Sequence, residues 1–387
     1  MSGLSVVDLR PRPTRSRPDY LLIGITAVLS ILGLVMILST SGPRLEAAGL
    51  ARTQQMTRQA IFVAMGVGVF LGGSLISDRN WRLLAPVIYM GTLILLFAVL
   101  SPVGALRQGA QRWIALGLFD LQPSEVAKVA AILALGLLLS PTEENRMTWL
   151  RLLKVAGLVI VPAVLIFVQP DLGTMLVFGF VTVVMLFVAG TNLRQLVLLG
   201  VVAIVGMLLA VELGILHDYQ VQRLTGFLNP GEQTLSINYN QNQSQIAIGS
   251  GGMFGRGLFE GTQTNLSFVP SQSTDFIFTA VAEQLGFAGG AIVIGLYALM
   301  IWRMLLVAAA ARDRFGELVA TGIAAMFGFH VFVNIGMAVG LLPVTGLPLP
   351  FLSFGGSFYL AMVLSVAIVN SIWMTRARTP GETRFFG

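Results

Sequence analysis

The sequence predicts an all-α, polytopic integral membrane protein with about ten transmembrane helices and a large fourth extracellular loop. Of its 387 residues, 55% are hydrophobic and only 11% are charged, whereas an ordinary globular protein is about 25% charged. The mean hydropathy is +0.82. Because a soluble protein of this length could not cover its surface with so few charges, we expect most of the chain to lie in lipid.

Ten apolar stretches approach the length of about 20 residues that a membrane-spanning helix needs. We therefore expect a cytoplasmic tail at 1–19, a membrane domain at 20–375 with an outer loop at about 212–275, and a second cytoplasmic tail at 376–387. The apolar cores are Leu21–Leu38, Ala60–Ile76, Leu83–Leu100, Val126–Leu139, Val155–Val168, Met175–Ala189, Leu196–Val211, Leu285–Ala311, Leu318–Leu342 and Phe358–Met374.

The positive charges predict the orientation. With a cytoplasmic amino terminus, 16 Lys and Arg residues fall on the inner side and 7 on the outer side, while Lys128 alone lies within a span. This asymmetry follows the positive-inside rule and predicts a multi-pass protein of the cytoplasmic (inner) membrane with both termini inside. Since the net charge of +6 is spread over loops and tails, with no basic stripe interleaved with aromatic residues, nucleic acid is not an expected partner.

Residue types exclude several kinds of chemistry. The chain has no Cys, which excludes thiol nucleophiles, disulfides and Cys-ligated metals. It has only two His residues, His217 and His330, which argues against a His-rich metal site or a Ser–His hydrolase. For His330, in the middle of a span, we favour a hydrogen-bonded packing role over a proton relay.

Two runs of biased composition in the outer loop, one that resembles a phosphate-binding loop and one that resembles a low-complexity segment, are not assigned a function. The glycine-rich run at 249–257 has no strand before it and no Gly-Lys-Ser/Thr after it, so it does not match a nucleotide-binding loop. The Asn/Gln-rich run at 238–245 is too short and too mixed to be prion-like.

Ionisable residues at the edge of a span are candidate functional residues because they are costly to place there. Gln122-Pro123-Ser124-Glu125 opens the fourth span, and Lys128 follows three residues after Glu125. Glu125 and Lys128 therefore share a helix face, and Ser124 is expected to cap the helix. The alternative is a structural ion pair that holds this helix to its neighbours.

A second polar segment, Gln169-Pro170-Asp171-Leu172-Gly173-Thr174, joins the fifth and sixth spans on the outer side. Proline, glycine and an Asx-type carboxylate are typical of a tight turn. Asp171 is therefore either a cap of the sixth helix or a residue of a site.

A third polar segment ends the long outer loop. Asp275 directly precedes Phe276-Ile277-Phe278, and a carboxylate at the edge of such a low-dielectric region is suited to act as a general base. Glu283, eight residues on, falls near the same helical face. The alternative is that Asp275 is the N-cap of the eighth helix.

The segment 342–357 interrupts the backbone between the ninth and tenth spans. It contains three prolines, three glycines and several polar residues, among them Ser353. Irregular backbone at membrane depth is tolerated only against protein or a water-filled cavity, and its free amides could receive an anionic group. All four polar segments fall on the outer side, whereas unrelated turns would divide between the two sides. We therefore expect one site that opens outward.

These four segments, in this order, resemble the signature blocks of the SEDS family (shape, elongation, division, sporulation). The resemblance covers about residues 20–375 and includes the ten spans and the large fourth outer loop. Within the family, 261–270 and 346–350 look more like RodA than the division protein FtsW.

The resemblance implies a peptidoglycan glycosyltransferase that polymerises lipid II at the outer membrane face during cell elongation and releases undecaprenyl pyrophosphate. It implies a class B penicillin-binding protein as crosslinking partner, together with other membrane proteins of the elongation complex. Asp275 is the expected catalytic residue. Where the family commonly has an acidic residue and a His just before it, this chain has Ser271 and Ser273, so no role is transferred to those positions.

The candidate residues suit this chemistry. Asp275 would accept the proton of the attacking sugar hydroxyl, and cations such as Lys128, Arg223 or Arg256 would neutralise the departing pyrophosphate. Whether a divalent cation such as Mg²⁺ assists is left open. The remaining candidate substrate-binding residues are Glu125, Asp171, Glu283 and Ser353.

Two other functions are compatible with charged residues in spans. A lipid II flippase would need them, but transporter sites lie near the bilayer midplane between repeated halves, and the sequence shows no repeat. A non-catalytic scaffold for cell-wall synthases would leave the outer carboxylates without a purpose.

Overall fold

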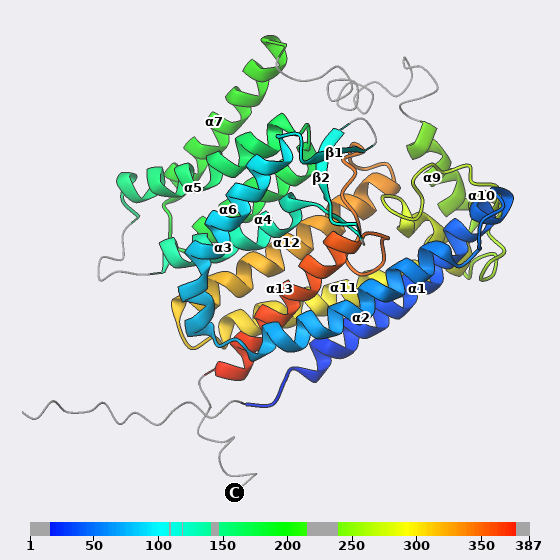
Figure 1. Cartoon of the computed structure of the whole chain (residues 1–387), viewed down its shortest axis with the longest axis horizontal. Coiled ribbons are helices and arrows are strands. Elements are labelled where there is room, and N and C mark those ends of the chain that lie inside the picture. Colours follow the sequence, from blue (N-terminus) through cyan, green and yellow to red (C-terminus); the bar gives the residue numbers. More distant parts are fainter. Residues whose placement is uncertain (1–15, 108–109, 118, 141–146, 215–238, 377–387) are drawn as a thin grey trace, which may run out of the picture.

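A computed structural model describes residues 16–107, 110–117, 119–140, 147–214 and 239–376. Ten long helices coincide with the ten predicted apolar stretches, which confirms the predicted fold class (Figure 1). Within the described residues, eight are long and apolar enough to cross a membrane, while α4 and α6 have 17 residues each. The ten are α1 (Tyr20–Ala47), α2 (Gln54–Leu75), α3 (Asp78–Val99), α4 (Pro123–Leu139), α5 (Trp149–Val168), α6 (Leu172–Val188), α7 (Leu193–Glu212), α11 (Ile277–Ala309), α12 (Arg314–Ala338) and α13 (Gly356–Thr375).

Helices α4, α12 and α13 form the centre of the bundle. In α12 and α13, 72% and 78% of the most apolar window is buried, against 6% in α7, and α4 is buried along nearly its whole length. Each central helix is apolar around its circumference, as expected of a helix enclosed by others. The helix that carries Glu125 and Lys128 is therefore surrounded by protein, whereas α7 projects from the bundle (Figure 1).

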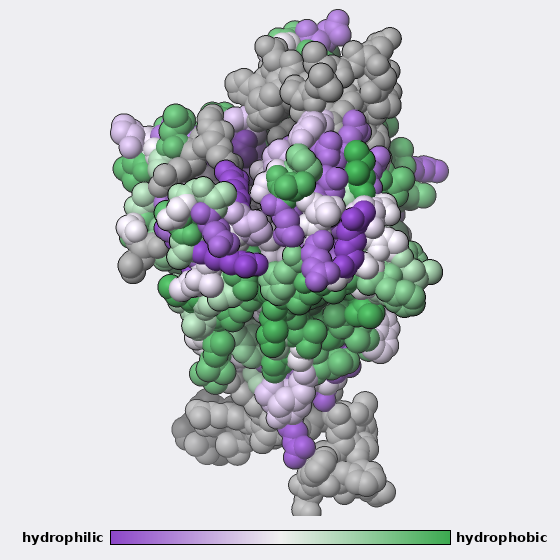
Figure 2. Space-filling model, turned by 90° about the vertical axis from the view of Figure 1, so that its right-hand side faces the viewer, coloured by the Kyte–Doolittle hydropathy of each residue, from purple (hydrophilic) through white to green (hydrophobic). Residues whose placement is uncertain are grey.

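The two ends of the bundle differ in character. At one end the described termini meet, because the backbone amide of Ser16 donates to the carbonyl of Met374 (2.9 Å). Nearby, Asp19 is 2% exposed and accepts a bond from Arg303 Nε at 2.6 Å. Figure 2 looks at the other end, where hydrophilic side chains gather above a broad hydrophobic surface.

That hydrophilic end carries a small antiparallel sheet that the sequence did not predict. Its strands β1 (Gly104–Arg107), β2 (Ala110–Ala115) and β3 (Asp120–Leu121) follow one another between α3 and α4, with a register irregularity at Ala105/Leu106. The predicted long loop lies at the same end and contains α9 (Tyr239–Ser250) and α10 (Thr262–Asn265). Residues 215–238 of that loop lie outside the described residues.

The glycine-rich run packs into a break in α11. At Gly286 the backbone has φ 69° and ψ −169°, which interrupts the helix. Four backbone hydrogen bonds between the run and α11 replace those lost at the break, at 2.8–3.1 Å: Arg256 N to Glu283 O, Gly257 N to Gln284 O, Phe287 N to Gly252 O and Ala288 N to Met253 O. A Cβ at Gly255 would lie 2.1 Å from the carbonyl oxygen of Gln284. Glycine is therefore required here for close backbone approach.

The Asn/Gln-rich run forms most of α9, which caps the end of α12. The last carbonyls of a helix have no partner within the helix. Ser244 Oγ donates to the carbonyl of Ala338 at 2.8 Å, and Gln241 Nε2 donates to those of Met337 and Leu342 at 3.1 and 2.9 Å. The polar composition of this run thus fixes the place where α12 ends and segment 342–357 begins.

Candidate functional site

The four polar segments meet at the hydrophilic end of the bundle, although they belong to four separate connections. The first and second touch through Gln122 Nε2 and Asp171 Oδ2 (3.5 Å). The first and fourth touch through the amide of Gln122, which donates to Ser357 Oγ (3.1 Å). The third and fourth touch through the amide of Phe354, which donates to the carbonyl of Ser273 (2.8 Å).

Glycine allows the second and fourth segments to approach each other. A Cβ at Gly173 would lie 2.9 Å from the carbonyl oxygen of Thr345 and 3.1 Å from the Leu347 side chain. The start of α6 therefore packs directly on segment 342–357. At this point the irregular backbone lies against protein, one of the two environments that tolerate it at membrane depth.

Glu125 and Lys128 form an enclosed ion pair in α4. Lys128 Nζ lies 2.8 Å from Glu125 Oε2, and the two side chains are 1% and 5% exposed. The ammonium also lies 3.1 Å from His330 Nε2 and 5.4 Å from the centre of the Phe358 ring. Because a lone charge would be costly in such a place, the acid, the imidazole and the aromatic face together stabilise the ammonium.

The partners of His330 identify its protonated nitrogen. Nδ1 lies 3.1 Å from the carbonyl oxygen of Pro348, which can only accept, so Nδ1 carries the hydrogen. An ammonium has no acceptor. Lys128 therefore donates to Nε2, and His330 is neutral in this arrangement.

Ser124 does not have its predicted role. The helix begins at Pro123 with Gln122 as N-cap, and no side chain makes a capping bond. Proline suits this first position because it has no amide hydrogen to satisfy. Ser124 thus lies inside the first turn, 1% exposed.

Asp171 is the N-cap of α6, one of the two roles that the sequence left open. Its carboxylate accepts from the amide and the hydroxyl of Thr174, at 3.1 and 2.9 Å. The turn before it is braced by Arg112 of β2, whose Nε donates to the carbonyl of Gln169 at 2.6 Å and whose Nη2 donates to that of Pro170. The same carboxylate still faces Gln122 of the first segment.

Asp275 lies half-buried where the third and fourth segments meet. The N-cap of α11 is Phe276 rather than Asp275, so the alternative reading of Asp275 as a helix cap is wrong. A Cβ at Gly346 would lie 3.5 Å from Asp275 Oδ2, which places the carboxylate beside segment 342–357. Its backbone carbonyl accepts a 2.7 Å bond from Asn334 Nδ2.

Ser353 holds the fourth segment in shape. Its hydroxyl accepts from the amide of Leu349 at 2.9 Å and donates to the carbonyl of Thr274 at 2.5 Å, and the residue is 1% exposed. Both bonds are internal to the protein. Ser353 therefore orders the backbone next to Asp275.

Glu283, Arg256 and Arg223 are not brought into this group by the described contacts. Glu283 is fully buried and accepts from the amides of Gln263 and Thr264 at 2.7 and 3.0 Å, which ties α10 to α11. Arg256 is exposed, and its Nε donates to the carbonyl of Ser250 at 3.1 Å. Arg223 lies outside the described residues.

The sequence did not predict three residues that contact the four polar segments as members of the site. His330 was assigned to packing, whereas Asn334 and Gln59 were not considered. Gln59 of α2 accepts from the amide of Gly355 at 3.2 Å. The sequence does contain a pattern that indicates His330 and Asn334. Both are polar residues within an apolar span, and their spacing of four residues places them on one helix face.

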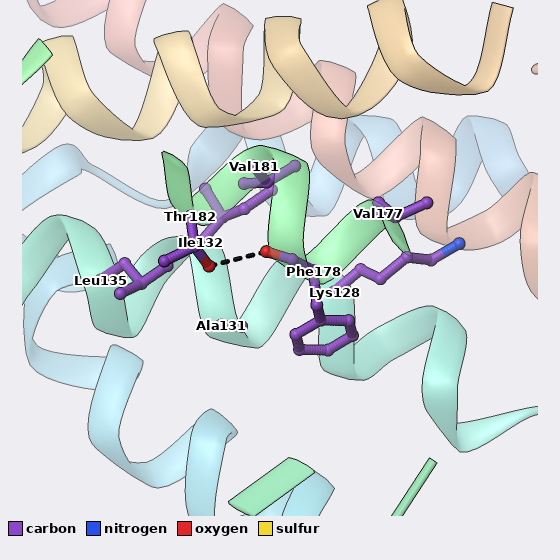
Figure 3. Close-up of a pocket in the computed structure, with 8 residues that line it drawn as sticks. All are labelled: Lys128, Ala131, Ile132, Leu135, Val177, Phe178, Val181 and Thr182. Carbon is purple, nitrogen blue, oxygen red and sulfur yellow. Dashed lines mark hydrogen bonds between the residues drawn. The ribbon is translucent and has the colours of Figure 1, made fainter. Parts of the chain in front are cut away.

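A small hollow lies between α4 and α6, next to Lys128. Figure 3 shows that Lys128 lines it only with its alkyl chain, while the ammonium points away. The rest of the lining is apolar apart from Thr182, whose hydroxyl donates to the carbonyl of Phe178 (2.6 Å). The polar chemistry therefore lies beside this hollow rather than in it. Among the described residues, no three His, Asp or Glu side chains are placed to share a metal ion.

Comparison with known proteins identifies the family. The family model of the FtsW/RodA/SpoVE cell cycle proteins matches residues 19–378. Peptidoglycan glycosyltransferase MrdB of Escherichia coli (strain K12) is 40% identical over 321 residues, 82% of this chain and 85% of that protein. Stage V sporulation protein E of Bacillus subtilis (strain 168) is 36% identical over 360 residues, 92% of this chain and 97% of that protein.

A solved structure has the same fold. That structure is described as "Structural coordination of polymerization and crosslinking by a peptidoglycan synthase complex". One of its chains superposes with a TM-score of 0.79 at 30% identity, covering 94% of this chain and 99% of that one.

Proposed function

As a member of the FtsW/RodA/SpoVE family of cell cycle proteins, the chain is a multi-pass membrane peptidoglycan glycosyltransferase, and we propose that it polymerises lipid II with Asp275 as general base. The observation that carries this assignment of the site is the convergence of four outer segments on Asp275 and on the Glu125–Lys128 pair. Relatives named peptidoglycan glycosyltransferase support the reaction class.

The reaction joins two lipid-linked sugars. A hydroxyl oxygen of one sugar forms a bond to the anomeric carbon of the other, and the bond from that carbon to the pyrophosphate breaks. Asp275 takes the hydroxyl proton, and the departing undecaprenyl pyrophosphate keeps the electron pair. The bond from Asn334 to the backbone carbonyl of Asp275 fixes the backbone that carries this carboxylate before substrate arrives, which lowers the cost of ordering it during the reaction.

Lys128 supplies positive charge from within the protein. Its side chain is 1% exposed and lies 2.8 Å from Glu125, so it acts as the positive end of an enclosed ion pair, whose field is stronger than it would be in water. Arg256 and Arg223 are the candidates for direct contact with pyrophosphate, since both belong to the outer loop. Arg256 is exposed there.

We place the active end outside the cytoplasmic membrane, with both termini in the cytoplasm, on the basis of the 16-to-7 distribution of cations. The partner we propose is a class B penicillin-binding protein of the elongation complex. Similarity to a chain of a complex described as coordinating polymerization and crosslinking supports a transpeptidase partner.

The decisive experiment uses the full-length protein with labelled lipid II and separates the products on a gel. We expect polymer from the wild type and none from Asp275→Asn, which keeps the shape of the side chain but removes the base. The matched control is Glu46→Gln, an exposed acid at the end of α1, which should polymerise normally. Polymer from Asp275→Asn would refute the assigned base, whereas movement of lipid across the membrane without polymer would favour a flippase.

A further inference from the structure

One face of α12 connects Asp275 to Lys128. His330 and Asn334 are four residues apart on this helix, about 6 Å along its axis, and both are fully buried. His330 contacts Lys128, and Asn334 contacts the backbone of Asp275. Two groups from distant parts of the chain are thus held by adjacent turns of one rigid helix.

Asn334 uses both of its amide hydrogens for this purpose. Nδ2 donates to the carbonyl of Asp275 and to that of Leu347, each at 2.7 Å. Its Oδ1 has no hydrogen-bond partner among the described residues, so the side chain is held by these two bonds. An amide can donate only two hydrogens, so a shift of either carbonyl costs a bond.

His330 holds the next residue of the same segment. Its Nδ1–H donates to the carbonyl of Pro348, directly after Leu347, while Nε2 accepts from Lys128. Two successive carbonyls of an irregular segment are therefore bound by α12. Such carbonyls have no helical or sheet partner and must be satisfied by side chains.

We propose that His330 and Asn334 are positioning residues that fix the distance and orientation between the Asp275 carboxylate and the Lys128 charge. This inference rests on the proposed function, because it concerns the geometry of that reaction. Neither residue touches substrate. Their effect is on the placement of two groups, and a displacement of about 1 Å can lower a rate by about 100-fold.

A double-mutant cycle in the lipid II assay tests the connection to Lys128. His330→Leu removes the acceptor and the donor, and we expect kcat to fall roughly 10- to 100-fold with KM changed less than about threefold. His330→Gln keeps one donor and one acceptor and should recover most of the rate. If His330 acts through Lys128, the double variant with Lys128→Met should be no slower than Lys128→Met alone, within about twofold.

Controls separate positioning from stability. Thr321→Val removes a buried hydroxyl of the same helix, which donates to the carbonyl of Glu317 within α12 (2.8 Å), and should leave kcat unchanged. Should His330→Leu fail to fold, Asn334→Asp carries the test, because it keeps the shape and loses at least one of the two donors, since even a neutral carboxyl group has a single O–H. We expect its kcat to fall at least about tenfold with little change in KM.

The results of these assays distinguish a failure of the positioning role from a failure of the proposed function. No polymer from the wild type, or full activity of Asp275→Asn, defeats the proposed function itself. If the wild type is active and Asp275→Asn is not, multiplicative effects of His330→Leu and Lys128→Met overturn the positioning role. Unchanged kcat in Asn334→Asp overturns it as well.

Discussion

Replacing Gly286 by alanine is expected to destabilise the amino-terminal part of α11. The φ of 69° and ψ of −169° at this residue lie in a region that is essentially restricted to glycine and costs other residues about 1–3 kcal/mol. A Cβ there would lie 2.2 Å from the amide nitrogen of Gly255 and 2.6 Å from the carbonyl oxygen of Met253. Those atoms are backbone, so they can move away only by breaking hydrogen bonds.

The size of the effect follows from the two ways to relieve this clash. Displacing the glycine-rich run would break four backbone hydrogen bonds, each contributing about 1 kcal/mol net. Since the protein follows the less costly route, we expect a loss of about 2–3 kcal/mol, combining strain with partly lost bonds.

The measurement is the thermal midpoint of the purified protein, followed by the loss of its monodisperse peak on heating. The matched control is Gly249→Ala in the same glycine-rich run, because Gly249 lies in α9 with nothing within 4 Å of a Cβ. Alanine favours a helix over glycine, so this variant should be as stable as the wild type or slightly more so. Equal midpoints for Gly286→Ala and Gly249→Ala would refute the reasoning.

Two further changes test the ends of the bundle. Asp19→Asn leaves Arg303 without its counter-charge and should lower the free energy of unfolding by about 3 kcal/mol. Glu317→Gln, in an ion pair whose side chains are about one-third exposed, should lower it by less than about 1 kcal/mol. The thermal midpoints of the two variants measure this difference, and equal losses would contradict the stronger stabilisation by the buried pair. Ser244→Ala removes a hydroxyl bond to the carbonyl at the end of α12 and should cost about 1–3 kcal/mol. Hydrogen exchange near residue 338 should then accelerate, and unchanged protection would show that α9 does not cap this helix.

The sequence predicted which segments are helical because hydrophobic length is a local property. All ten apolar stretches became helices, and the extra sheet at 104–121 is short and lies outside them. The capping of α4 was predicted wrongly because Ser124 and Pro123 both suit a helix start. Proline occupied the first position and Gln122 became the N-cap.

The sequence predicted that the polar segments gather at one end, but not which neighbours each of their side chains would contact. Glu125, Lys128 and Asp275 could be chosen because charges next to apolar runs are visible in one dimension. Glu283 has the same appearance, yet its carboxylate is occupied by the backbone of α10. Which partner a buried acid meets depends on a segment 20 residues away, and no local pattern encodes that pairing.

The sequence by itself determined the membrane class, the ten apolar helices and the clustering of polar segments at one end, because each follows from the free energy of placing a residue type in lipid or water. Only the tertiary structure decided that His330 and Asn334 connect Lys128 to Asp275, and that the two runs of biased composition complete α11 and α12. The physical reason is that a buried hydrogen bond requires a partner at about 3 Å. Such proximity arises only when distant segments pack together.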